Sequence, residues 1–229
     1  MNNLRSFLLG QGASLVGFGD VHEQYHPDGQ IPIFPCGVSI ALAIPPEVIR
    51  GISHQPSMDY YNAYHDLNDK LDELAKSCAK YIEERGYHAY AQTVGEVQEF
   101  GVYTTAMPHK TVAVASGLGW IGKSALFVTE EYGSAIRLTS VLTDAPLSVA
   151  TETKEAKCGD CMQCKNACPG HAITGKRWEK EKERDWIFDA VKCRKAAREI
   201  ADQSIHREIT LCGKCIQVCP YTRRYVEGN

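Results

Sequence analysis

The clearest alternation of apolar and polar positions lies in residues 66–87, DLNDKLDELAKSCAKYIEERGY. Apolar side chains recur there every three or four residues, so a helix would present them on one face. They are Leu67, Leu71, Leu74, Cys78, Tyr81 and Ile82. We expect Asp66 to cap the start of this helix and Gly86 to supply a left-handed exit at its end. Because Cys78 lies on the apolar stripe, it is predicted to be a core thiol.

Shorter apolar stretches predict strands. Residues 13–20 (ASLVGFGD) and 36–44 (CGVSIALAI) are typical of short, mostly buried strands, and Cys36 is expected to be a second packed thiol. Residues 125–149 are rich in β-branched and aromatic side chains on both sides of the turn-like EEYGS, a pattern that predicts a hairpin. Residues 178–203 predict a charged helix.

The composition changes near residue 151, where the polar stretch TETKEAK leads into a cysteine-rich segment. The pattern as a whole predicts an α+β chain with two domains. We expect an α/β domain with a mixed sheet over residues 1–150 and a cysteine-rich domain over residues 151–229.

Composition and charge place the chain in an ordinary class. With 44% hydrophobic and 23% charged residues, the 229-residue chain resembles a soluble globular protein. Its net charge of −3 provides no overall positive field that would attract nucleic acid or an anionic membrane. Residues 1–20 do not have the pattern of a signal peptide. The apolar run at residues 38–49 is short and contains two prolines, so no membrane span is expected and a cytoplasmic location is predicted.

Residues 117–124, GLGWIGKS, match two glycine-rich motifs of nucleotide-binding proteins, G-x-x-x-x-G-K-[ST] and G-x-G-x-x-G. Both motifs bind phosphate at the N-terminus of a helix that follows the loop. Here the stretch SALFVT favours a strand, and EEYGS interrupts the chain before a helix of about ten residues could form. We therefore do not expect a nucleotide site, and the glycines are expected to allow a close backbone turn against a large, flat group.

Eight of the ten cysteines lie between Cys158 and Cys219. Disulfides are not expected, because the chain has no secretion signal and is long enough to form a core without them. The first group has the spacing C-x2-C-x2-C-x3-C-P, and the second has C-x2-C-x3-C-P with Cys193 upstream. Bacterial ferredoxins with two 4Fe-4S clusters have this pattern, in which the cysteine before each proline binds the other cluster.

The spacing assigns four thiolates to each cluster. The first cluster would be bound by Cys158, Cys161, Cys164 and Cys219. The second would be bound by Cys168, Cys193, Cys212 and Cys215. Zinc also accepts four thiolates, but two zinc sites would leave the C-P ends of both groups unexplained. Two cubane clusters predict one-electron transfer at low potential, and the roughly 150 preceding residues leave room for another cofactor or a substrate.

The stretch 117–147 (GLGWIGKSALFVTEEYGSAIRLTSVLTDAPL), followed by CGDCMQCKNACPGHAI and CGKCIQVCP, resembles the epoxyqueuosine reductases. Tyr64 and His65, in YHDLNDKLDELA, match the equivalent segment of that family. The resemblance covers roughly residues 55–221, and the reductive dehalogenases share the architecture. It implies a nitroreductase-like N-terminal domain that binds cobalamin and a two-cluster ferredoxin-like domain. The clusters would supply electrons to cobalt and generate a strongly reducing Co(I) centre.

The resemblance gives the glycine stretch a role. Its glycines would let the backbone lie close to the corrin ring or its tail, with Trp120 packed nearby. Lys123 is either a contact of the corrin tail or a solvated surface charge. The predicted cofactor-binding residues are Gly117, Leu118, Gly119, Trp120, Gly122 and Lys123.

One departure concerns the proton donor. The family carries an Asp general acid fourteen residues before the first glycine of GLGW, and Tyr103 occupies that position here. A phenol can donate a proton, as a tyrosine does in the related dehalogenases, so Tyr103 is the candidate catalytic residue, against an alternative of ordinary packing. His109 and Lys110 are the next candidates, and His65 is expected to cap or anchor its helix.

A second departure concerns the C-terminus. The chain ends ten residues after Cys219, whereas the epoxyqueuosine reductases continue into a helical-repeat region that helps to hold tRNA. The chain is therefore expected to be a short member of the family. Together with the net acidity, this leads us not to expect tRNA as a partner.

The cysteine pattern, together with what the resemblance implies about cobalamin, leads us to expect a cobalamin-dependent iron–sulfur oxidoreductase that reduces a small-molecule substrate. Its electrons would come from a low-potential donor such as a ferredoxin or flavodoxin. One alternative is an electron-transfer or corrinoid-reducing protein without substrate chemistry of its own. Another is a ferredoxin domain joined to an inert α/β domain that docks a partner. Corrinoid binding would separate the last alternative from the others.

Overall fold

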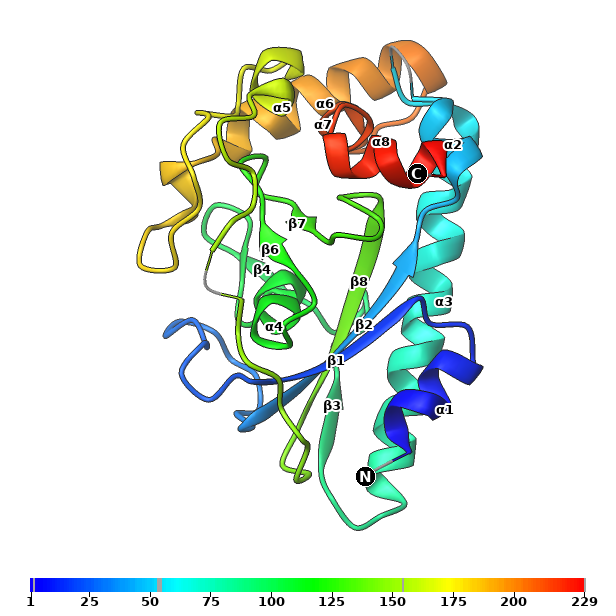
Figure 1. The fold of residues 1–229 in the computed structure, drawn as a ribbon, viewed down its shortest axis with the longest axis vertical. Coiled ribbons are helices and arrows are strands. Elements are labelled where there is room, and N and C mark those ends of the chain that lie inside the picture. Colours follow the sequence, from blue (N-terminus) through cyan, green and yellow to red (C-terminus); the bar gives the residue numbers. More distant parts are fainter. Residues whose placement is uncertain (2, 53–54, 154, 229) are drawn as a thin grey trace. The chain divides into compact units, whose positions relative to one another are not determined.

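The computed structural model describes residues 1, 3–52, 55–153 and 155–228. The chain divides into two compact units, each built from three segments (Figure 1). The first unit comprises Met1–Leu42, Leu67–Gly119 and Arg137–Thr153. The second comprises Ala43–Asp66, Trp120–Ile136 and Lys154–Asn229. The sequence predicted a single boundary near residue 150. The division differs from it, because Ala43–Asp66 and Trp120–Ile136 group with the cysteine-rich segment.

A four-stranded sheet with the order β1-β2-β8-β3 forms the centre of the first unit (Figure 1). The strands are β1 (Leu15–Asp20), β2 (Cys36–Ala43), β8 (Ile136–Thr143) and β3 (Ala89–Ala91). β1 pairs antiparallel with β2, and β3 pairs antiparallel with β8. The strands predicted within residues 13–20 and 36–44 are confirmed, and so is the α+β class; the mixed character of the sheet stays a prediction.

The long helix α3 runs from Met58 to Glu83, so its predicted start at Asp66 is wrong. The physical reason is a cap further upstream: the Oγ of Ser57 accepts a hydrogen bond from the backbone N–H of Tyr60 at 3.2 Å. His65 therefore lies within the helix and does not cap it. The predicted exit is confirmed, since Gly86 has φ +83°.

The predicted apolar stripe of α3 is buried. Leu71, Leu74, Cys78 and Ile82 are at most 3% exposed and join residues of α1 (Leu4–Gly10), β1 and β2 in one apolar cluster. Cys78 is thus a core thiol, as predicted, and burial raises its pKa. Cys36 is only partly buried, and burial also raises the pKa of its thiol.

The helix α4 (His109–Ala115) lies against β1 in the first unit. The contact depends on Gly19, where a Cβ atom would lie 2.6 Å from the backbone carbon of Ala115. A short hairpin precedes this helix, formed by β4 (Glu99–Phe100) and β5 (Thr104–Thr105).

The second unit consists mainly of short helices. They are α2 (Pro46–Arg50), α5 (Gln163–Ala167), the 3-10 turn η1 (Arg184–Trp186), α6 (Ala190–Ile205), α7 (Lys214–Gln217) and α8 (Pro220–Glu227). The helix predicted over 178–203 begins later than expected because Asp189 caps α6, accepting a hydrogen bond from the backbone N–H of Lys192.

The hairpin predicted over residues 125–149 is wrong in its pairing. β7 (Phe127–Val128) pairs antiparallel with β6 (Trp120–Ile121), while β8 joins the sheet of the first unit. The glycine stretch therefore contributes a strand to this small hairpin. The expectation that no helix follows Lys123 directly is confirmed, since β7 is the next element.

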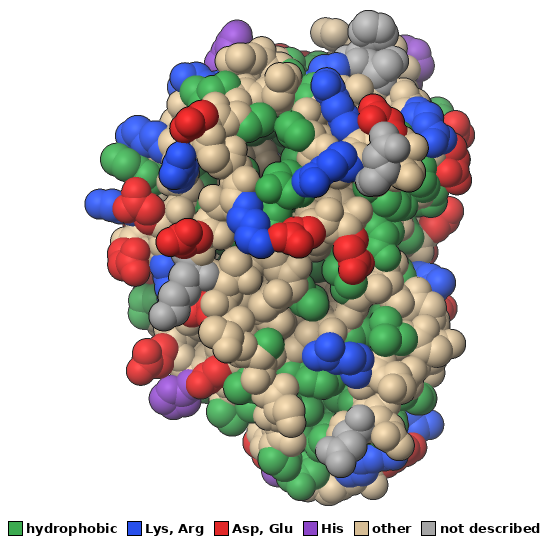
Figure 2. Space-filling view, in the orientation of Figure 1, with side chains coloured by type: hydrophobic (Ala, Val, Ile, Leu, Met, Phe, Trp, Pro, Cys, Tyr) green, Lys and Arg blue, Asp and Glu red, His purple; other side chains and the backbone are tan. Residues whose placement is uncertain are grey.

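The surface shown in Figure 2 carries acidic and basic side chains interspersed with one another, in keeping with the small net charge of −3. No helix in the described part of the chain has both the length and the apolar character that crossing a membrane requires.

Candidate functional site

All eight cysteines of the two predicted cluster sets lie in the second unit and are partly buried. Short helices and the turns between them carry these thiols: Cys164 lies in α5, Cys193 in α6 and Cys215 in α7. The turn before α7 requires a glycine at position 213, where φ is +75° and a Cβ atom would lie 2.8 Å from the ring of Tyr60.

Five of these thiols line one small cavity. The four predicted ligands of the first cluster line it, together with Cys215 from the other set. The remaining lining residues are Gly122, Lys123, Ser124, Val128, Pro220 and Tyr221. The cavity thus gathers the three closely spaced cysteines and the distant Cys219, which the spacing pattern assigned to the same cluster.

The electrostatics of the thiols divide them in the same way. Burial, together with the neighbouring Cys158, Cys161 and Cys219, raises the pKa of Cys164 to about 11. Burial likewise raises the pKa of Cys193 to about 11, with added contributions from Cys168 and Cys212. Burial is the largest cause for both, and the other thiols that raise the pKa of each belong to its own predicted set.

Cys215 is the point where the two sets meet. The pKa of its thiol is raised well above the ordinary value, and burial is the largest cause. Nearby thiols of both sets are the further causes: Cys212, Cys193, Cys164 and Cys168. Thiols held this way resist ionisation unless a positively charged group compensates them, and a coordinating metal centre does so. The donor set therefore fits two iron–sulfur cubanes. Within the described residues, no group of three or more His, Cys, Asp or Glu side chains is arranged around a single metal ion.

The glycine stretch is divided between the units. Gly117, Leu118 and Gly119 belong to the first, where Gly117 has φ +68° and a Cβ atom there would lie 2.9 Å from the carbonyl oxygen of Thr151. Gly122 belongs to the second, and a Cβ atom at its position would lie 3.6 Å from the Sγ of Cys158. The second half of the stretch therefore adjoins the thiol cavity.

Trp120 is 1% exposed and packs edge-to-face on Tyr221 with ring centroids 5.0 Å apart. Its Nε1–H is buried and has no acceptor among the described residues. Buried donors in folded proteins are nearly always satisfied, so the indole is a fitting contact for an acceptor that the chain does not itself supply. A cofactor amide or a cluster sulfide has that chemistry.

Lys123 is 5% exposed, so the alternative of a solvated surface charge is wrong. Its Nζ donates a hydrogen bond to the carbonyl oxygen of Cys161 at 3.1 Å and lies 3.7 Å from the Sδ of Met162. No local pattern marks Lys123 as a buried residue, and lysines are seldom buried without a partner.

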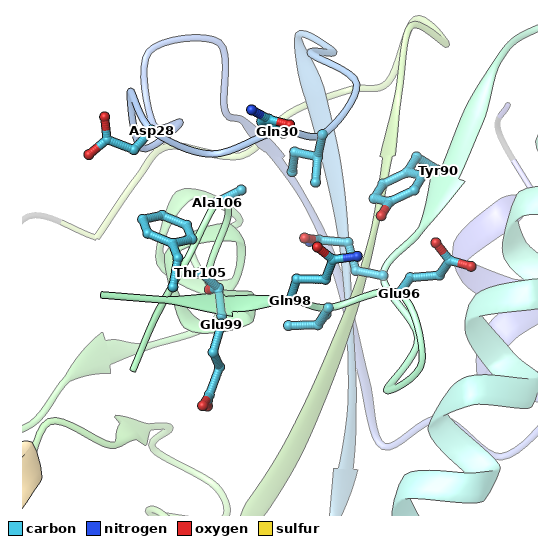
Figure 3. A pocket seen from close by; sticks show the side chains of 12 residues that line it. Asp28, Gln30, Tyr90, Glu96, Gln98, Glu99, Thr105 and Ala106 are labelled. Atoms are coloured by element: carbon cyan, nitrogen blue, oxygen red, sulfur yellow. The ribbon is translucent and has the colours of Figure 1, made fainter. Parts of the chain in front are cut away.

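The first unit has a larger pocket of about 470 Å³ (Figure 3). Tyr90 and Glu96 lie on one side of it and Asp28 on another, and the Glu96 carboxylate adds to the burial that raises the pKa of Tyr90. The complete lining is Asp28, Gln30, Ile31, Tyr90, Gln92, Glu96, Val97, Gln98, Glu99, Phe100, Thr105 and Ala106. Three carboxylates and no basic side chain are among these residues, a composition that favours a neutral or cationic ligand.

Tyr103 lies in the turn of the β4–β5 hairpin, with φ +53° and an exposed fraction of 37%. The hairpin strands on either side contribute to the pocket, but Tyr103 is not among its lining residues. Positive φ is uncommon for a tyrosine and marks a conformation held by its surroundings. Its role as a proton donor stays a prediction.

His109 lies in a polar network that the sequence did not reveal. Its Nδ1 is 2.8 Å from the Oγ of Ser140, which also accepts a hydrogen bond from the Nε2 of Gln92 at 2.6 Å. Burial lowers the pKa of His109 to about 4, and the nearby Arg137 contributes. The imidazole is therefore neutral at pH 7, which weakens His109 as a candidate acid. His65, by contrast, is exposed on α3 with its ring edge-on to Tyr61.

The cysteine-rich part belongs to a recognisable class. Residues 157–222 match the family described as the 4Fe-4S double cluster binding domain. This match covers the eight cysteines that lie between Cys158 and Cys219 and places that segment among the iron–sulfur proteins.

The particular resemblance predicted from the sequence is confirmed. The chain is 31% identical over 182 residues to the epoxyqueuosine reductase of Gloeobacter violaceus, covering 74% of this chain and 51% of that protein. It is 31% identical over 122 residues to the epoxyqueuosine reductase of Listeria monocytogenes, covering 53% of this chain and 31% of that protein. The chain thus spans about half or less of the length of these curated relatives.

Solved structures share the fold. The catabolic reductive dehalogenase NpRdhA in complex with 3-bromo-4-hydroxybenzoic acid has a TM-score of 0.76 at 20% identity, covering 96% of this chain and 31% of that chain. The epoxyqueuosine reductase from Streptococcus thermophilus has a TM-score of 0.63 at 22% identity, covering 97% of this chain and 66% of that chain.

One prediction about partners is wrong. A further structure with this fold is an epoxyqueuosine reductase in complex with a tRNA-Tyr epoxyqueuosine-modified stem loop, with a TM-score of 0.61 at 20% identity, covering 97% of this chain and 65% of that chain. Together with the names of the curated relatives, it overturns the expectation that tRNA is not a partner. Net charge was a poor guide, because a docking surface needs only local charge.

Proposed function

We propose that the protein is a cobalamin-dependent iron–sulfur reductase in which two 4Fe-4S clusters supply electrons for reductive cleavage or deoxygenation of a substrate. The observation that carries this proposal is the cavity lined by Cys158, Cys161, Cys164 and Cys219 within the segment that matches the double cluster domain. Cobalamin, when bound, supplies a cobalt centre that accepts electrons at low potential and passes them to a substrate. A ferredoxin or flavodoxin would reduce the clusters.

The residues proposed to hold the clusters are the two sets predicted from the spacing. Cys158, Cys161, Cys164 and Cys219 would hold the first, and Cys168, Cys193, Cys212 and Cys215 the second. For cobalamin, the proposed contacts are the backbone of Gly117–Gly119 and the indole N–H of Trp120, whose lack of an acceptor within the described chain supports this assignment.

We propose that the substrate is a small molecule or a single modified nucleoside. The pocket of the first unit, about 470 Å³, has the size of small-molecule sites and is polar enough to orient such a group. A nucleoside carried by tRNA is supported by the names of the relatives and by the tRNA-bound neighbour. Tyr103 is the proposed proton donor, since it occupies the position of the family's acid.

The proposal is tested by anaerobic reconstitution of the clusters, addition of cobalamin and desalting, followed by measurement of iron and cobalt per chain. About eight irons and one cobalt per chain are expected. Reduced holoprotein is then mixed with an epoxyqueuosine-containing tRNA stem loop or with a panel of small epoxides and aryl halides, and oxidation of the cobalt is followed in the visible spectrum.

The outcomes separate the functions. Oxidation by either class of compound identifies a reductase and its substrate class. Stoichiometric cobalt that no compound oxidises would favour a corrinoid-reducing protein without substrate chemistry. Eight irons without retained cobalt would leave an electron carrier and overturn the proposed use of cobalamin.

A further inference from the structure

Lys123 is a buried cation beside the first set of thiols. It is 5% exposed and lines the cavity that the four predicted ligands of the first cluster share. Its Nζ donates a hydrogen bond to the carbonyl oxygen of Cys161 at 3.1 Å. This bond positions the ammonium group beside the segment that carries Cys158, Cys161 and Cys164. Gly122, directly before it, approaches Cys158 closely enough that a Cβ atom would lie 3.6 Å from the Sγ.

The contacts of Lys123 are with neutral atoms. Besides the carbonyl oxygen of Cys161, its Nζ lies 3.7 Å from the thioether sulfur of Met162, and no carboxylate of the described residues forms an ion pair with it. A buried ammonium group without a carboxylate is costly unless another negative group compensates it. Thiolates bound to a cluster at the same cavity are the negative groups that the site offers.

We propose that Lys123 is a positioning and charge-compensating residue that raises the reduction potential of the cluster bound by Cys158, Cys161, Cys164 and Cys219. The inference rests on the proposed function, because it assumes that these four cysteines bind that cluster. The step is transfer of one electron from the external donor to the cluster, with no bond formed or broken and no proton moved. The added electron increases the negative charge of the cluster.

The direction of the effect follows from electrostatics. A positive charge stabilises the more negative, reduced cluster more than the oxidised one, and low solvent exposure strengthens the interaction. The lysine would thereby make it easier for the external electron donor to reduce the first cluster. It would affect the second cluster less, because Cys215 is the only member of that set that lines the same cavity.

The test compares Lys123→Met, which keeps an unbranched side chain as long as the aliphatic part of lysine but removes the charge, with Lys165→Met. Lys165 follows Cys164 directly and is exposed, so water and ions screen its charge. Anaerobically reconstituted proteins are titrated with dithionite, and both cluster potentials are followed by electron paramagnetic resonance. Lys123→Met is expected to lower the equilibrium constant for one-electron reduction of one cluster about tenfold, about 59 mV. Lys165→Met should change it less than twofold.

A third variant separates charge from structure. Lys123→Gln keeps a neutral donor to the carbonyl oxygen of Cys161, and it should lower the potential as Lys123→Met does. Full iron content with unchanged potentials in Lys123→Met or Lys123→Gln would overturn the inference. Loss of the first cluster in both variants would also overturn it, in favour of a purely structural lysine. Wild-type protein that binds no clusters would instead reject the proposed function, so the two failures are distinguishable by iron analysis.

Discussion

In the first unit the buried side chains form a continuous apolar cluster between α3 and the sheet, whereas in the second unit eight partly buried thiols lie among short helices. The longest helix that lies wholly in the second unit, α6, has 16 residues, and α5 and α7 have five and four. Isolated helices of four or five residues are unstable without tertiary contacts. The second unit also buries apolar side chains, among them Ile52, Ile187 and Leu211, but its shortest helices carry the cluster cysteines. We therefore expect it to depend on the groups that its cysteines bind to a greater degree than the first unit does.

The largest expected effect is a loss of bound iron from the second unit when Cys215, the thiol where the two sets meet, is replaced. Cys215→Ala should abolish binding of the second cluster and lower the iron content by at least about half, because a cubane needs all four thiolates. Iron per chain and near-ultraviolet circular dichroism after anaerobic reconstitution measure the loss. Cys78→Ala is the matched control, since Cys78 is buried in the first unit and should leave iron binding intact. Full iron in Cys215→Ala would contradict the ligand assignment.

A substitution in the apolar cluster should lower the stability of the first unit without removing iron from the second. Leu71 is 2% exposed in the apolar cluster, and Leu71→Ala should lower the free energy of unfolding by about 2–5 kcal/mol through lost burial and the cavity left behind. Denaturant unfolding of the reconstituted protein measures it. Iron content should stay near that of the wild type at moderate denaturant. A parallel loss of iron would show that the two units do not differ in what stabilises them.

The parts of each unit that the sequence predicted are those encoded locally. The stripe from Leu67 to Ile82 and the exit at Gly86 follow from a repeat of a few residues, and the cluster sets follow from fixed spacings between cysteines. The start of α3 was missed because Asp66 is also a residue type that caps helices, and only the structure shows that Ser57 is used. A local signal thus predicts an element better than its boundary.

Contacts between distant segments could not be predicted. β7 pairs with β6 across the short turn at residues 122–126, whereas β8 lies between β2 and β3, which are far from it in the sequence. The choice of β2 and β3 as partners of β8 depends on which apolar surfaces meet. The network of Gln92, His109 and Ser140 joins residues 31 and 48 positions apart, and nothing in the local sequence marks them as neighbours. Lys123 resembles any surface lysine until the structure places it beside the thiols.

The hydrogen-bond network of Gln92, His109 and Ser140 makes the stability of the first unit depend on pH, because it contains a titratable histidine. The pKa of His109 is about 4 in the folded protein, below the usual value near 6.5, so the unfolded chain binds the extra proton first as the pH falls. Stability from this group is therefore present above about pH 6.5 and is lost between about pH 6.5 and pH 4. The loss between pH 7 and pH 5 is on the order of 2 kcal/mol, because His109 is nearly fully protonated at pH 5 in the unfolded chain and mostly neutral in the folded protein.

Denaturant unfolding at pH 7 and pH 5 measures this loss for the wild type and for His109→Gln. Glutamine keeps a hydrogen bond to Ser140 but does not titrate. Other acid-sensitive groups, including the clusters, cancel in the difference between the two proteins. An equal fall in stability for both would show that His109 is not the source.

The smallest expected change in stability concerns Tyr103, in the hairpin turn of the first unit. Its side chain is 37% exposed, so removing the hydroxyl in Tyr103→Phe should change the free energy of unfolding by no more than about 0.5 kcal/mol. If the phenol donates the proton, single turnover with an oxidising substrate should nevertheless slow by about 10²-fold or more. The two measurements are therefore expected to diverge. Unchanged turnover would remove Tyr103 from the chemistry and leave its backbone, at φ +53°, as a feature of the turn alone.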